Sequence, residues 1–146
     1  IGWCDWSSDV CSSDLPKEAI STTKAPSAIG PYSQGIKAGN MVFTSGQLPI
    51  DPETKKVPEE VKDQAQVALS NVANVLEAAG ASLRDVVKVT VFLLNIKDFG
   101  EVNEVYKEFF DDDEALPYPA RSAIQVAALP GPVGCKLEIE AVAVIG

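Results

Sequence analysis

The segment VVKVTVFLL at residues 86–94 decides the fold. β-Branched residues dominate this run, and it is long enough to cross a sheet, so we expect a strand here. The run is apolar at positions that face both sides of a sheet, which is typical of a strand covered on both faces. A similar apolar run occurs at residues 142–145. Together these runs predict a sheet whose central strands are covered on two sides.

Hydrophobic periodicity on either side of this segment predicts two helices. The first should begin after Pro58 and stop at Gly80. Apolar residues recur in it close to every 3.6 positions, at Val61, Ala65, Leu69, Val72, Leu76 and Ala79. Asp98 and Glu101 resemble a capping box that opens the second helix. Its expected apolar face comprises Val102, Val105, Tyr106, Phe109 and Phe110.

The remaining segments predict four more strands. Residues 35–38 and 41–47 flank the turn Gly39-Asn40 and should form a hairpin. Residues 122–127 and 136–145 should form two strands separated by the turn at 130–134. The stretch before residue 35 is punctuated by Pro26 and Gly30-Pro31, and we expect it to be irregular.

The expected order is therefore β-β-α-β-α-β-β, an α+β fold with a single mixed sheet. Two right-handed β-α-β crossovers place both helices on one face of that sheet. The other face then has no helix to cover it. We expect a second copy of the chain to cover it in a symmetric homo-oligomer.

Composition limits the classes of function. A chain of 146 residues with 46% hydrophobic content predicts one globular domain. No apolar run approaches the roughly 18 residues that span a bilayer. The net charge of −9 disfavours a nucleic-acid partner. Because the chain has no histidine, Ser-His-Asp and Cys-His machinery is excluded, and so is the commonest zinc ligand.

Residues 1–16 are excluded from the fold prediction. They carry Ser-Ser-Asp twice and no lysine or arginine, so they resemble appended non-native material and not a signal peptide. The domain proper is expected at residues 17–146. Cys4 and Cys11 lie in the excluded segment and Cys135 stands alone, so no disulfide framework is expected and a reducing, cytoplasmic setting fits best.

Arg121 is the strongest candidate for a functional residue. It is one of two arginines and lies in the phrase Pro117-Tyr118-Pro119-Ala120-Arg121-Ser122. Prolines stiffen the backbone around it. A guanidinium is a planar, permanently charged donor suited to a carboxylate or a phosphate. The alternative is a structural ion pair with Glu138 or another acid.

Five short motifs follow one another along the chain. They are Gly30-Pro31-Tyr32-Ser33-Gln34, Thr44-Ser45-Gly46-Gln47, Val102-Asn103-x-x-Tyr106, Pro119-Ala120-Arg121-Ser122 and Glu138-Ile139-Glu140-Ala141. In this order they resemble the RidA family, also called the YjgF family, of enamine and imine deaminases. The resemblance covers the chain from about Lys17 to the end.

The resemblance implies a chorismate-mutase-like fold assembled as a homotrimer with clefts between subunits. It also implies hydrolysis of reactive 2-enamines and 2-imino acids, such as 2-aminoacrylate, 2-iminopropanoate and 2-iminobutanoate, to 2-keto acids and ammonia. No cofactor is implied.

The resemblance also assigns roles to residues. Arg121 is expected to hold the substrate carboxylate, and Glu138 to position or activate the attacking water, with Glu140 structural. Tyr32 is expected to contact substrate in a neighbouring subunit's cleft. Supporting contacts are expected from the backbone donors of Ser45 and Gly46, from Asn103, and from the backbone carbonyl of Ala123.

Each role has a plainer alternative. Glu138 could belong to a solvated face of an edge strand, Tyr32 could cap a core, and Asn103 could be a solvated helix residue. Many family members carry a cysteine at the position of Ala123, so a thiol-dependent switch is not expected. The acidic run 111–114 lacks the spacing of a calcium loop and is expected to be an exposed loop, so no metal site is predicted.

Three other functions stay open from the sequence. One is a regulatory module that binds 2-keto acids through Arg121 without turnover. Another is an RNA-cleaving or translation-inhibiting protein, which the acidic charge and the lack of histidine disfavour. The third is a holdase-like scaffold, which would require exposed apolar patches.

Overall fold

The computed structural model describes residues 16–112 and 116–146. The segment predicted to be non-native therefore lies outside the described residues except for Pro16, and so do residues 113 and 114 of the acidic run. The strands are β1 (Glu18–Ile20), β2 (Gly35–Ala38), β3 (Met41–Thr44), β4 (Val86–Leu93), β5 (Ala120–Gln125) and β6 (Leu137–Val144). The long helices are α2 (Val61–Ala78) and α3 (Phe99–Phe110). Within the described part of the chain, no helix is long and apolar enough to cross a membrane.

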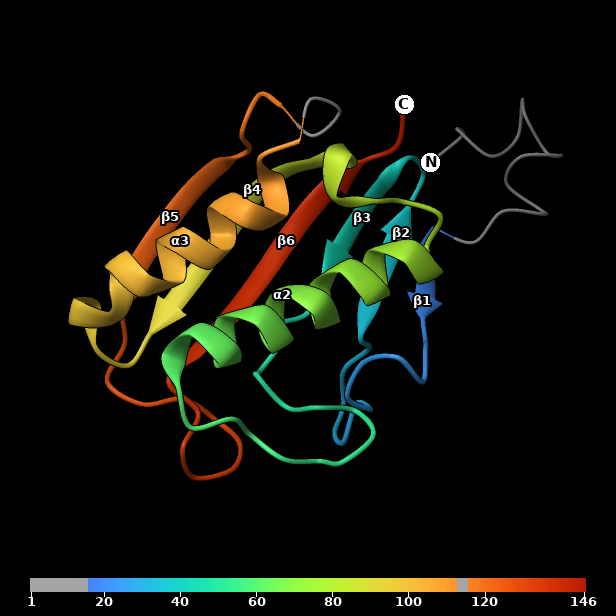
Figure 1. The fold of residues 1–146 in the computed structure, drawn as a ribbon. Helices are drawn as coiled ribbons and strands as arrows, with labels where there is room; N and C mark the ends of the chain where they lie inside the picture. Colours follow the sequence, from blue (N-terminus) through green and yellow to red (C-terminus); the bar gives the residue numbers. More distant parts are fainter. Residues whose placement is uncertain (1–15, 113–115) are drawn as a thin grey trace, which may run out of the picture.

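The six strands form one mixed sheet in the order β1-β2-β3-β6-β4-β5. Only β4 and β5 pair in parallel, and the other neighbours are antiparallel. The last strand, β6, enters between β3 and β4, so the β3-α2-β4 crossover spans it. The second crossover, β4-α3-β5, joins adjacent strands. Figure 1 shows both helices over the same face of the sheet, as the sequence predicted.

The core lies between the helices and this face of the sheet. All six periodic residues of the first predicted helix are buried, and so are four of the five of the second, Phe109 being half-buried. From the sheet side the core receives alternate residues, which include Val89, Val91, Ile139 and Ala141. The two-residue alternation of the strands leaves their other side chains on the helix-free face.

Two details of the sequence prediction are wrong. The stretch before residue 35 contains strand β1, whose Glu18 and Ile20 pair with Lys37 and Gly35 of β2. Three residues are too few to show a strand alternation. Asp98 makes no side-chain cap and has helical dihedrals (φ −80°, ψ −7°). The reason is that a 3₁₀ turn at Ile96–Asp98 precedes α3, and Asn95 caps that turn by accepting from the Lys97 N–H.

The helix-free face of the sheet is mixed in character. It carries apolar side chains that are part-exposed, including Phe43 at 40% and Ile124 at 46%. It also carries Lys88, whose Nζ donates to Ser122 Oγ at 3.0 Å. The expectation that residues 86–94 are apolar on both faces therefore holds only in part. On the helix face of β4 the side chains are buried, whereas on the other face apolar and polar side chains share the surface.

Candidate active site

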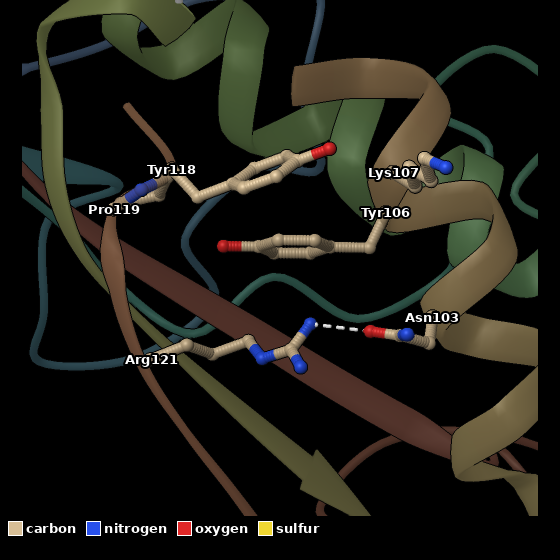
Figure 2. Close-up of a pocket in the computed structure, with 6 residues that line it drawn as sticks. All are labelled: Asn103, Tyr106, Lys107, Tyr118, Pro119 and Arg121. Carbon is tan, nitrogen blue, oxygen red and sulfur yellow. Dashed lines mark hydrogen bonds between the residues drawn. The ribbon is translucent and has the colours of Figure 1, made fainter. Parts of the chain in front are cut away.

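Arg121 projects from β5 toward α3. In the parallel register it lies beside Val89, which is buried under the helices. Its Nη1 donates to Asn103 Oδ1 at 2.8 Å. Its guanidinium carbon lies 4.5 Å from the ring centre of Tyr106 and 5.2 Å from that of Phe99. Figure 2 shows the guanidinium beneath the Tyr106 ring and the Tyr118 ring above it.

All three contacts to the guanidinium come from one stripe of α3. Phe99, Asn103 and Tyr106 are spaced i, i+4 and i+7, so the helix turns them toward the same strand. No carboxylate of the described residues lies within ion-pair distance of Arg121. The charge of Arg121 is therefore held by aromatic faces and one amide oxygen.

A cavity of about 500 Å³ opens beside this guanidinium. Its lining is mixed polar and aromatic and consists of Asn103, Tyr106, Lys107, Tyr118, Pro119 and Arg121 (Figure 2). Burial raises the pKa of Tyr106 to about 12, and the Arg121 charge opposes that shift. Its hydroxyl therefore stays protonated near neutral pH, and it has no hydrogen-bond partner among the described residues. The cavity thus offers an anion a fixed cation and aromatic walls.

Glu138 lies on the opposite face of the sheet. It pairs with Phe92, whereas its neighbour Ile139 is buried under the helices. A Cβ added at Gly46 would lie 2.5 Å from Glu138 Oε2, so the carboxylate packs against the glycine backbone. Burial, and then the charge of Glu140, raise the pKa of Glu138. A half-buried carboxyl with a raised pKa is a stronger base than an exposed one and is suited to accepting a proton from water.

The loop after β3 links Glu138 to the segment that carries Tyr32. The Ser45 N–H donates to the Gln34 carbonyl at 2.9 Å, and its Oγ donates to the Ser33 carbonyl at 2.5 Å. Both donors of Ser45 are therefore used within the chain. The Gly46 N–H has no partner among the described residues. Tyr32 is 52% exposed and lines a second cavity near β1.

Each chain thus places the candidate residues in two separate groups. Arg121, Asn103 and Ala123 lie on the helix side of β5 and α3, with Ala123 beside buried Val91. Glu138 lies with Gly46 and the Ser45 loop on the helix-free side of β6. Strand β4 separates β6 from β5. Arg121 and Glu138 therefore form no ion pair within one chain, although the sequence had left such a structural pair open as an alternative for Arg121.

Sequence reasoning missed two of the contacts to Arg121. It placed Tyr106 on an apolar helix face and in a family motif but predicted no contact of Tyr106 with Arg121, and it did not consider Phe99. The i, i+4, i+7 spacing of these rings around Asn103 was the available signal. No cluster that could hold a metal ion occurs among the described residues. Cys135 is a buried free thiol, and burial raises its pKa.

A family model described as Endoribonuclease L-PSP matches residues 22–145, which is most of the chain. The chain belongs to this family. The RidA resemblance is confirmed by a solved RidA structure from the Antarctic bacterium Psychrobacter sp. PAMC 21119, which is 48% identical with a TM-score of 0.80. The alignment covers 88% of this chain and 99% of that one.

Two relatives from Escherichia coli carry functional names. The 2-iminobutanoate/2-iminopropanoate deaminase of strain K12 is 50% identical over 127 residues, or 87% of this chain and 97% of that protein. The crystal structure of E. coli TdcF with bound serine is 52% identical with a TM-score of 0.83. It covers 88% of this chain and 99% of the TdcF chain. The RidA-family fold expected from the motifs is thereby confirmed.

Proposed function

We propose that this protein hydrolyses 2-imino acids, and the enamines in equilibrium with them, to 2-keto acids and ammonia. The observation that carries the proposal is Arg121, whose guanidinium lies at the wall of a cavity and has no carboxylate partner among residues 16–112 and 116–146. A 2-imino acid presents a carboxylate next to the reacting carbon. A relative that is 50% identical is named for the same reaction class.

The reaction can be assigned to residues. Arg121 binds the substrate carboxylate through a charge-assisted pair and so fixes the imine carbon. Glu138 takes a proton from water as the water oxygen adds to the C=N carbon. Glu138 passes that proton to the nitrogen, which gives a carbinolamine. The hydroxyl proton of this intermediate is then transferred to the nitrogen as the C–N bond breaks, so that ammonia leaves and the 2-keto carbonyl remains. Ala123 supplies a backbone carbonyl near the nitrogen, as the resemblance implies.

We infer that two copies of the chain build each site. Arg121 and Glu138 project from opposite faces of the sheet, so a single chain does not present both to one small substrate. A homotrimer in which the helix-free face of one copy meets the β5–α3 edge of the next would bring them together. Tyr32 and Gly46 would then contact the substrate from the same copy as Glu138. The part-exposed apolar residues of the helix-free face support this arrangement.

An RNA-cleaving function has one observation in its favour, which is the family description. Two features of the chain oppose it. The net charge of −9 repels a phosphate backbone, and the chain has no histidine for acid–base cleavage.

A cytoplasmic location stays a prediction, supported by the free thiol of Cys135.

The assay generates 2-aminoacrylate and 2-iminobutanoate with a dehydratase and follows the appearance of keto acid. We expect the protein to accelerate hydrolysis above the spontaneous rate. Arg121→Ala should lower kcat/KM by about 10- to 100-fold, because it removes a charge-assisted contact. Arg121→Lys keeps the charge but not the planar fork and is the control. Its kcat/KM should lie between that of the parent protein and that of Arg121→Ala. The absence of any acceleration by the parent protein would contradict the proposal.

A further inference from the structure

Aromatic rings hold the Arg121 guanidinium at a place where arginine in a protein commonly has a carboxylate. We propose that Phe99 and Tyr106 are positioning residues that hold this guanidinium in place of a counter-ion. Its charge then stays available for the carboxylate of the substrate. The inference rests on the proposed function, since it explains how the anion site of that function is kept open.

The Tyr106 ring is held by contacts that do not involve Arg121. Tyr106 is 4% exposed, and its ring packs against Phe110 at 4.7 Å between centroids with a tilt of 33°. Figure 2 shows the guanidinium beneath the face of the Tyr106 ring. A cation over an aromatic face is attracted to the ring quadrupole, and the attraction grows when water is excluded. Tyr106 therefore presents a rigid surface on which the guanidinium rests.

Asn103 fixes the remaining freedom of the guanidinium. Its Oδ1 accepts one N–H from Nη1 at 2.8 Å. A guanidinium has five N–H donors, so this bond leaves donors for an anion. The rings hold the guanidinium carbon in place, and the amide fixes the direction of one N–H. A neutral amide does this without cancelling the positive charge.

The distribution of acids on α3 supports this reading. The helix carries Glu101, Glu104 and Glu108, yet none of them is within ion-pair distance of Arg121. Glu104 instead pairs with Lys62 of α2 at 3.0 Å, and Glu101 and Glu108 also raise the pKa of Lys62. The acids of α3 thus interact with Lys62 of α2. The stripe of α3 that faces β5, which consists of Phe99, Asn103 and Tyr106, is uncharged.

Steady-state kinetics of imine hydrolysis test the proposal with three variants. Tyr106→Leu should raise KM about tenfold with kcat changed less than about threefold, since a misplaced cation weakens carboxylate binding. Tyr106→Phe keeps the ring, and its KM should stay within about threefold of the parent. Phe109→Leu, which removes a half-buried ring of α3 away from Arg121, is the control and should leave KM unchanged.

Several outcomes would overturn the proposal. One is a folded Tyr106→Leu variant with the KM of the parent. Another is a Tyr106→Phe variant with KM raised as far as in Tyr106→Leu, since the hydroxyl and not the ring would then be responsible. If Tyr106→Leu does not fold, Phe99→Leu takes its place, and an unchanged KM in Phe99→Leu would likewise overturn the proposal. An inactive parent protein would contradict the proposed function instead.

Chemical rescue distinguishes a positioning role of the rings from a purely structural one, because a purely structural role would not affect rescue. Methylguanidinium added to Arg121→Ala should restore part of the activity, because the rings and Asn103 remain to hold it. The double variant Arg121→Ala with Tyr106→Leu should show clearly weaker rescue at the same concentration. Equal rescue of both variants, or no rescue of Arg121→Ala, would contradict the role of the rings.

Discussion

A glycine at position 46 lets the Glu138 carboxylate occupy the space that a Cβ would fill. An added Cβ would lie 2.5 Å from Glu138 Oε2 and 2.6 Å from its Cδ, which is closer than real contacts. The carboxylate would have to move, while the backbone at this position has no positive φ to strain. Gly46 thus links the sequence motif directly to the geometry of the candidate base.

We predict that Gly46→Ala lowers kcat by about 10²-fold, which is the scale of losing a positioned general base. The thermal midpoint should change little. Gly100→Ala on α3 is the matched control, because nothing lies within 4 Å of its Cβ position. It should keep full activity. Coupled keto-acid assays on both variants measure this, and unchanged kcat in Gly46→Ala would contradict the placement of Glu138.

Glu138 should make both activity and stability depend on pH. Its pKa is raised above 4.5 by burial and by Glu140. Since the folded state favours the protonated form, Glu138 adds stability at acid pH that is lost as pH rises through its folded-state pKa. Glu138 must be deprotonated to act as a general base. The rate of imine hydrolysis should therefore increase over the pH range in which this stability is lost.

We therefore predict that Glu138→Gln melts at a higher temperature than the parent at neutral pH. The difference should shrink below pH 4.5, where the carboxyl of the parent is protonated in both states. The same variant should lose about 10²-fold in kcat. Thermal melts across pH provide the measurement. A neutral-pH melting temperature below that of the parent would mean that the carboxylate is stabilised by a partner.

At the residue level, motifs identified the candidates but not their surroundings. Arg121 stood out because of its proline context, and Asn103 because of its motif. That Phe99 and Tyr106 hold Arg121 depends on how α3 is rotated over β5, which the apolar face of the helix alone does not specify. The use of both Ser45 donors within the chain depends on the close approach of the Ser33–Gln34 segment. Such contacts arise from tertiary packing.

At the level of elements, the first helix is tied to the loops by one buried amide. Gln64 is fully buried on α2, and its Nε2 donates to the carbonyls of Pro58 and Gly134 at 2.8 Å each. Its Oε1 accepts from the Lys136 N–H at 2.7 Å. This one side chain therefore joins the entry to α2 with the turn that leads into β6, the strand that carries Glu138.

We predict that Gln64→Leu lowers the free energy of unfolding by about 1–3 kcal/mol, because it removes three hydrogen bonds to part-buried backbone groups and places an apolar side chain against them. Gln66→Leu, on the same helix but exposed, is the control and should change stability by less than about 0.5 kcal/mol. Urea denaturation measures both. Equal stability of the two variants would show that solvent readily replaces the bonds of Gln64.

Helices and long strands were predictable because their periodicity extends over many residues. The six periodic positions of α2 and the run at 86–94 specified the two crossovers correctly. Strand β1 and the start of α3 were not predictable. The first has three residues, and the second depends on a 3₁₀ turn that moves the cap from Asp98 to Asn95. Short elements are decided by their neighbours and leave little pattern in the sequence.

At the level of the whole molecule, the sheet divides the candidate site into two parts. Arg121 faces α3 on one side, and Glu138 faces away from the helices on the other. The helix-free face carries part-exposed Phe43 and Ile124. The sequence predicted an uncovered face, and we propose that the next copy of the chain covers it and completes the site.

Mixing two inactive variants tests this account most directly. Arg121→Ala and Glu138→Gln should each form oligomers with little imine hydrolysis. Refolded together, they should regain activity, because every mixed trimer contains one site with an intact Arg121 from one copy and an intact Glu138 from another. Mass spectrometry of the mixture establishes that mixed oligomers form. Mixed oligomers that stay as inactive as the separate variants would contradict a site shared between copies.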